Sequence, residues 1–115
     1  MLKEIGLINY PVKDLVKAKQ WYEAMHGVKP YMDSDVYVGY LINGINVGLN
    51  PNGYEEGMTG PVIFWKCGDI ISAVDEAVNN GATISREPRQ LGSQILASLV
   101  GADGILFGFI QILNN

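Results

Sequence analysis

The fold of this chain is constrained most by an internal repeat of a strand followed by a helix. After Gly6 successive residues alternate between two faces, as they do in a strand, and Asp14 then offers a side-chain acceptor to the free amides of a helix start. The pattern returns from Pro61, with Asp69 in the equivalent position. Each copy is too small to bury a core alone, so we expect the two copies to fold together.

A hairpin extends the first copy. Asn43-Gly44 separates two apolar runs, 36–42 and 45–50, and this dipeptide readily takes the left-handed angles of a two-residue turn. Pairing Ile42 with Ile45 sends alternate residues to opposite faces. One face, with Val38, Tyr40, Ile42, Ile45, Val47 and Leu49, is expected to cover the helix.

The second copy ends in a similar way, because Asp103-Gly104 also favours a hairpin turn, here within residues 95–112. Gly44 to Gly48 then align with Gly104 to Gly108. Further strands are predicted over 28–32 and 82–86, and a loop over 88–92. The predicted order is strand, helix and three strands, twice.

The length of 115 residues suits one domain. We divide it into a first module over about residues 1–50, a linker over 51–60 and a second module over 61–115. The linker is rich in glycine and carries Glu55 and Glu56, which would form an acidic rim attractive to cationic ligands.

Composition excludes several classes of protein. Hydrophobic residues make up 48% of the chain and charged residues 17%, which leaves apolar surface for a partner subunit, so we expect a homodimer. A net charge of -4 without a Lys/Arg cluster argues against nucleic-acid binding. No apolar run approaches the roughly 20 residues that span a membrane. The single cysteine excludes an internal disulfide, and we predict a cytoplasmic protein.

The double order of elements, with the segments YPVKDLVKAKQWYEAMHG, GATISREPRQLGSQ and ADGILFGFIQ, resembles the vicinal oxygen chelate superfamily. This family includes glyoxalase I, extradiol dioxygenases, and fosfomycin and bleomycin resistance proteins. The resemblance covers nearly the whole chain. It implies an α+β fold in which tandem βαβββ modules form a curved mixed sheet that encloses a cleft, with the helices outside.

Enzymes of this family hold a divalent metal with His, Glu or Gln side chains from the first and last strand of each module. The resemblance places Leu7, Gly48, Val62 and Gly108 at those four positions. None of these side chains binds metals. We therefore predict no metal, no other cofactor and no catalytic residue.

The cleft remains as a predicted binding site. By strand alternation and by the family resemblance, the predicted ligand-binding residues are Leu7, Asn9, Tyr37, Asn46, Gly48, Asn50, Phe64, Lys66, Gly108 and Ile110. Gly39, Gly48 and Gly108 supply no side chains to fill the space, which favours a cavity over a packed core. Phe64 and Ile110 could instead fill the space between the sheets, and Lys66 could be a surface lysine. Cys67 is expected to face the second helix as an inert buried thiol.

The sequence favours a metal-independent protein that binds a small, partly aromatic and possibly cationic molecule. One alternative is a metal-dependent lyase, isomerase or dioxygenase of the glyoxalase group, with ligands from unexpected positions such as Asn9, Asn50 or Gln111. A second alternative is a structural or regulatory dimer subunit that uses its apolar surface only for a partner.

Overall fold

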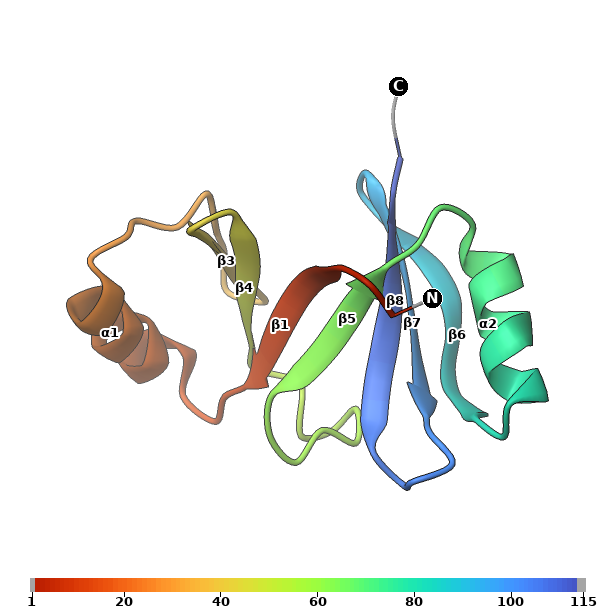
Figure 1. The fold of residues 1–115 in the computed structure, drawn as a ribbon. Coiled ribbons are helices and arrows are strands. Elements are labelled where there is room, and N and C mark those ends of the chain that lie inside the picture. Colours follow the sequence, from red (N-terminus) through yellow and green to blue (C-terminus); the bar gives the residue numbers. More distant parts are fainter. Residues whose placement is uncertain (1, 114–115) are drawn as a thin grey trace. The chain divides into compact units, whose positions relative to one another are not determined.

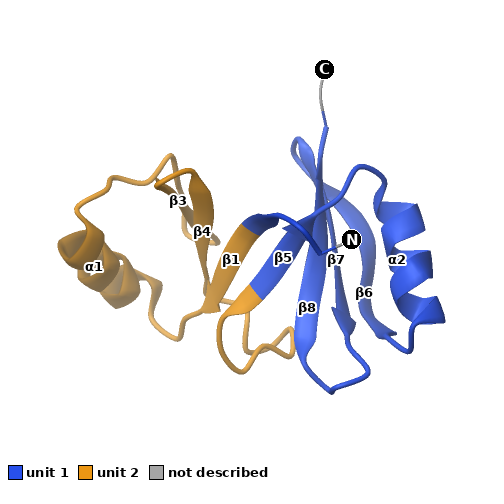
Figure 2. Ribbon diagram, viewed as in Figure 1, with its two compact units in different colours: residues 1–6, 63–115 blue, residues 7–62 orange. Residues whose placement is uncertain are grey.

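The computed structural model describes residues 2–113, which form two compact units (Figures 1 and 2). Unit 2 contains residues 7–62, and unit 1 contains residues 2–6 and 63–113. Strand β1 (Ile5–Pro11) crosses the boundary between them, because Ile5 and Gly6 belong to unit 1.

Unit 2 contains one helix and the strands of the first module. Its elements are β1, α1 (Leu15–His26), β2 (Met32–Asp33), β3 (Val38–Ile42) and β4 (Ile45–Asn50). Strands β2, β3 and β4 pair antiparallel in sequence order, and β1 pairs parallel with β4. The first strand of the module therefore lies beside its last.

Unit 1 repeats this arrangement with the second module. Its elements are β5 (Val62–Lys66, of which Val62 still belongs to unit 2), α2 (Ile70–Asn79), β6 (Thr83–Leu91), β7 (Gln94–Val100) and β8 (Leu106–Ile112). Strand β5 pairs parallel with β8, while β6, β7 and β8 pair antiparallel in sequence order. The same pairing in both units confirms the predicted tandem βαβββ order.

The Asn43-Gly44 turn sets the register of the first hairpin as predicted. The second hairpin has a longer connection, because β7 ends at Val100 and β8 begins at Leu106. Asn43 and Gly44 have φ angles of 54° and 84°, and Ile42 pairs with Ile45. Gly104 has a φ of 85°. These left-handed angles suit asparagine and glycine, which explains why the turns form where the sequence indicates.

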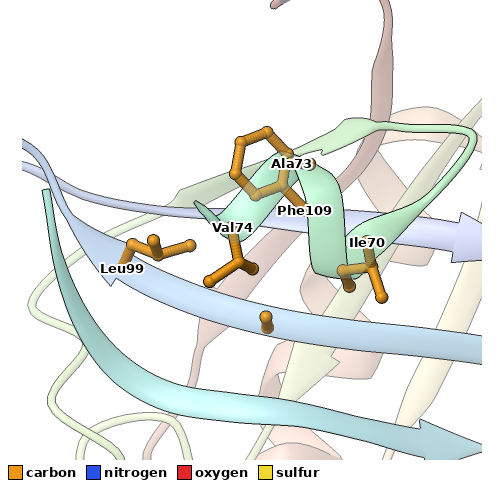
Figure 3. Packing of buried hydrophobic residues seen from close by; sticks show 6 residues of the cluster. Ile70, Ala73, Val74, Leu99 and Phe109 are labelled. Carbon is orange, nitrogen blue, oxygen red and sulfur yellow. The ribbon is translucent and has the colours of Figure 1, made fainter. Parts of the chain in front are cut away.

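The two helices pack unequally on their sheets. Ile70, Ala73 and Val74 of α2 are buried against Leu99 and Phe109 in the core of unit 1 (Figure 3). No residue of α1 is buried. The core of unit 2 consists of Val12, Val38, Tyr40 and Leu49, with Leu15, Ala18 and Tyr22 of α1 packed around it.

Several predicted details were wrong. The helical spacing of apolar residues predicts that Met25 of α1 and Val78 of α2 lie on the buried helix faces, but they are 66% and 41% exposed. The strand predicted over 28–32 is reduced to Met32–Asp33. The loop predicted over 88–92 is mostly strand, because β6 continues to Leu91 through two irregularities in its register.

No helix within residues 2–113 has the length and apolar character needed to cross a membrane.

Each helix begins at a predicted aspartate. The Asp14 side chain accepts a hydrogen bond from Lys17 N at 3.1 Å. The Asp69 carboxylate accepts from Ile71 N at 3.1 Å and from the Ser72 hydroxyl at 3.0 Å. Both aspartates therefore accept hydrogen bonds from backbone amides that have no partner within the helix.

Replacing Asp69 with alanine should lower the free energy of unfolding by about 1 kcal/mol, because α2 loses its N-terminal acceptor while keeping its buried face. The control is Asp75→Ala, which removes an exposed carboxylate from the middle of the same helix. Urea melts of the two variants measure the difference, and an equal loss in both would contradict the assigned role of Asp69.

Candidate ligand-binding site

In unit 2, the sheet face opposite α1 carries a group of predicted site residues. Tyr10, Tyr40 and Leu49 point toward the helix and belong to the core around it. Strand alternation sends their neighbours to the other face. There Asn9 pairs with Gly48, Leu7 pairs with Asn46, and Gly39 pairs with Gly48. We call these five residues the glycine face of unit 2.

Tyr37 covers Gly48 on this face. A Cβ added to residue 48 would lie 1.8 Å from the Tyr37 hydroxyl oxygen and 2.4 Å from its Cζ atom. The ring therefore needs glycine at this position. Gly48 was expected to leave open space, but the space directly above it is occupied by the phenol.

Tyr31 covers Gly39 in the same way, with its ring 3.0 Å from the position of an added Cβ. The pKa of Tyr37 is raised above its usual value. The larger cause is burial of the phenol, and the smaller cause is its interaction with the neighbouring Tyr31. Burial also raises the pKa of Tyr31. Both hydroxyls therefore stay protonated at neutral pH and can donate hydrogen bonds.

Asn9 is the least satisfied polar residue of this face. Asn9 is only 7% exposed, and its Oδ1 atom has no hydrogen-bond partner among residues 2–113. A buried acceptor without a partner costs roughly 1–3 kcal/mol relative to one that is satisfied. Such a group is an unused acceptor for a ligand.

The side chain of Asn50, another predicted site residue, forms hydrogen bonds with nearby residues of the chain. Its Oδ1 accepts from Asn52 N at 2.9 Å, and its Nδ2 donates to Glu56 Oε1 at 3.1 Å. Its backbone carbonyl accepts from Val12 and Gly53. Asn50 therefore holds the turn that follows β4.

Unit 1 has a related face opposite α2. Phe64 pairs with Gly108, and Lys66 pairs with Ile110. A Cβ added to Gly108 would lie 2.2 Å from Phe64 Cδ2 and 2.7 Å from the Ala97 carbonyl oxygen. Phe64 and Ile110 are 5% and 1% exposed. Above Gly108, the hydrocarbon ring fills the space that the sequence was expected to leave open.

Three residues that were not predicted at the site, Ser98, Arg86 and Arg89, also lie on this face. Ser98 pairs with Gly108 on one side and with Arg86 on the other, and Arg89 pairs with Leu96. Arg86 and Arg89 lie in the segment that was predicted partly as a loop. The register irregularities of β6 hide its alternation, so only the cluster of two arginines could have pointed to them.

Two titratable side chains of β5 and its end have structural roles. Lys66 Nζ forms a surface ion pair with Glu4 at 3.1 Å. The Cys67 thiol packs toward the core beneath α2 and donates to the Ile110 carbonyl at 3.6 Å. Burial, with a smaller effect of Asp69, raises the pKa of Cys67, which makes the thiolate scarce.

His26 lies at the end of α1, away from the glycine face. Its Nδ1 accepts a hydrogen bond from Val28 N at 3.1 Å, and its ring contacts the Tyr40 ring edge-on at 4.6 Å. His26 therefore caps the helix end.

A groove of about 370 Å³ in unit 2 lies elsewhere, between α1 and the segment before β3. Its lining residues are Leu15, Val16, Lys19, Gln20, Glu23, Asp33, Ser34, Asp35 and Val38. None of them is a predicted site residue.

The residues at the four family metal positions do not fit a metal ion. Leu7 and Val62 are apolar and buried, and the space of a side chain at Gly48 or Gly108 is taken by a ring. Among residues 2–113, no three His, Cys, Asp or Glu side chains gather in a way that could hold a metal.

Comparison with solved structures identifies the fold. A glyoxalase/bleomycin resistance protein/dioxygenase superfamily member from Vibrio splendidus 12B01 superposes with a TM-score of 0.68 at 19% identity, covering 91% of this chain and 96% of that one. The chain has the vicinal oxygen chelate fold. No protein-family model and no curated protein sequence matches it.

Two methylmalonyl-CoA epimerases share the vicinal oxygen chelate fold. The enzyme from Mycobacterium tuberculosis has a TM-score of 0.73 at 13% identity, with 98% of this chain and 90% of that chain covered. A variant of the Streptomyces coelicolor enzyme in complex with 2-nitronate-propionyl-CoA has a TM-score of 0.78 at 16% identity, with coverages of 97% and 96%.

Gly108→Ala should lower the free energy of unfolding by about 1–3 kcal/mol, because the new methyl group meets a buried ring and a backbone carbonyl. The control is Gly68→Ala, since nothing lies within 4 Å of a Cβ at that exposed position. Gly57 would be a poor control, because its φ of 94° strains any other residue. A Gly108→Ala protein as stable as Gly68→Ala in urea would show that the space above Gly108 is open.

Proposed function

We propose that this protein binds a small, partly aromatic organic molecule without a metal ion. The observation that carries the proposal is the glycine face of unit 2. There a phenol lies over Gly48, where the enzymes of this fold are expected to place a ligating side chain, and the nearby Asn9 oxygen has no partner. Aromatic walls with a few polar groups are typical of small-molecule sites.

The rival proposal of a metal-dependent enzyme needs ligands from unexpected positions, and two of the three candidates are already engaged. Asn50 holds the turn after β4, and Gln111 Oε1 accepts from Ile70 N at 2.9 Å. Asn9 remains, but a single amide oxygen does not make a metal site. The similarity to the two epimerases therefore concerns the fold and does not extend to their reaction.

We propose an uncharged ligand in place of the cation expected from the sequence. That expectation rested on Glu55 and Glu56, and Glu56 supports the turn by accepting from Asn50. We place the protein in the cytoplasm, because its one cysteine cannot form an internal disulfide.

Chelator-treated protein should still be stabilised by a bound aromatic compound, and elemental analysis should find no stoichiometric metal. A ligand at 100 times its dissociation constant should stabilise the native state by about 2.7 kcal/mol, which a thermal-shift screen of neutral aromatic compounds detects. Gly48→Ala should reduce this ligand-induced shift, because the added methyl group displaces the end of the Tyr37 side chain.

The matched control is Gly60→Ala, because nothing lies within 4 Å of a Cβ at that position in the same unit. One tightly held metal per chain, or stabilisation that disappears with chelator, would favour the metal-dependent alternative.

We also propose a homodimer in which α1 contributes to the interface. Trp21 and Met25 are one turn apart on α1 and are 58% and 66% exposed, and no residue of this helix is buried. Large apolar side chains gathered on one helix favour contact with a partner subunit.

Native mass spectrometry at micromolar concentration should show a dimer, and Trp21→Glu should shift it toward the monomer. Ile71→Glu is the control, since Ile71 is an exposed apolar residue, 58% exposed, on the other helix. A monomeric wild-type protein would contradict the proposed dimer.

A further inference from the structure

We propose that the ligand presents an N–H group directly beside a carbonyl group, as a lactam or a cyclic imide does. The N–H group donates to Asn9 Oδ1, and the carbonyl oxygen accepts from the Tyr37 hydroxyl. This inference rests on the proposed function and specifies the chemistry of the same site in unit 2.

The acceptor of the pair is Asn9. The residue is 7% exposed, and its Oδ1 atom is buried without a hydrogen-bond partner among the described residues. Buried polar atoms in folded proteins nearly always have a hydrogen-bond partner. A ligand donor that satisfies a buried acceptor without a partner therefore contributes favourably to the free energy of binding. A ligand without a donor would leave the oxygen unsatisfied.

The donor of the pair is Tyr37. Its hydroxyl lies over Gly48, and Gly48 is paired with Asn9 across neighbouring strands. Because paired residues of adjacent strands lie about 5 Å apart, the phenol oxygen and the Asn9 side chain stand side by side on one face. Burial keeps the phenol protonated, so it acts as a donor.

One acceptor beside one donor is complementary to a ligand edge with one donor beside one acceptor. Lactams and cyclic imides carry this edge on a planar ring, and the Tyr31 and Tyr37 rings provide aromatic surface for such a ring. A carboxylate has no donor for Asn9 Oδ1, and a protonated amine has no acceptor for Tyr37. The neutral amide edge satisfies both.

Three matched probes test the proposal: 2-quinolone, N-methyl-2-quinolone and quinoline. Isothermal titration calorimetry of the full chain should show 2-quinolone binding at least about tenfold more tightly than N-methyl-2-quinolone, which lacks the donor. In Asn9→Leu this preference should disappear. In Tyr37→Phe, 2-quinolone and quinoline should both bind more weakly, because the carbonyl oxygen of one and the ring nitrogen of the other lose the phenol donor.

The control variant is Asn52→Leu, which replaces an exposed asparagine of the same unit and should keep the tenfold preference. Urea melts add a second readout. Asn9→Leu should keep or raise the unfolding midpoint, because it removes an unsatisfied buried oxygen, whereas a structural role for Asn9 predicts a lower midpoint.

The outcomes separate this inference from the proposed function. Equal binding of 2-quinolone and its N-methyl derivative, or a tenfold preference that survives in Asn9→Leu, would overturn the amide-edge inference while leaving a small-molecule site in place. A lower unfolding midpoint for Asn9→Leu would also count against it. Failure of all three probes to bind would count against both.

Discussion

An aromatic ring lying over a glycine of the sheet is the contact on which the candidate site depends. It occurs once in each unit, with Tyr37 over Gly48 and Phe64 over Gly108. The two modules use it for different ends. In unit 1 the ring is the hydrocarbon ring of Phe64, which fills the space above Gly108 without offering a hydrogen bond. In unit 2 the ring ends in a hydroxyl beside an unsatisfied amide, so that face keeps hydrogen-bonding capacity. The same ring-over-glycine contact thus carries a hydrogen-bond donor in one module and none in the other.

The sequence predicts this fold well where the signals are local. Alternation and the Asn43-Gly44 turn define the β3–β4 register, and Asp14 and Asp69 mark the helix starts. The position of the Tyr37 ring could not be predicted, because it depends on a loop in which the Ser34 hydroxyl binds both the amide and the carbonyl of Tyr37. The sequence therefore located the glycines but suggested empty space above them. The extent of β6 was missed for a similar reason, since register irregularities conceal a strand from periodicity.

The two helices hold their sheets by different means. Helix α2 buries three apolar residues, so hydrophobic contact is enough to fix it. Helix α1 buries none, and polar and aromatic contacts at its C-terminal end add to the partial packing of Leu15, Ala18 and Tyr22. The Tyr40 hydroxyl donates to Glu23 at 3.1 Å, and His26 bridges the Tyr40 ring and the Val28 amide. Burial, together with the hydrogen bond and negative charge of Glu23, raises the pKa of Tyr40, which keeps this donor in place. Unit 2 therefore depends more on a few directional contacts than unit 1 does.

The form of β6 bears on how this chain behaves when crowded. It is a long strand at the edge of the unit 1 sheet, and such edges are templates on which further chains assemble into fibrils. Proline at position 88 has no amide hydrogen to offer an incoming strand, and the two register irregularities disrupt the row of groups around it. The register irregularities that made β6 hard to recognise in the sequence thus also disfavour pairing of this edge with a strand of another molecule.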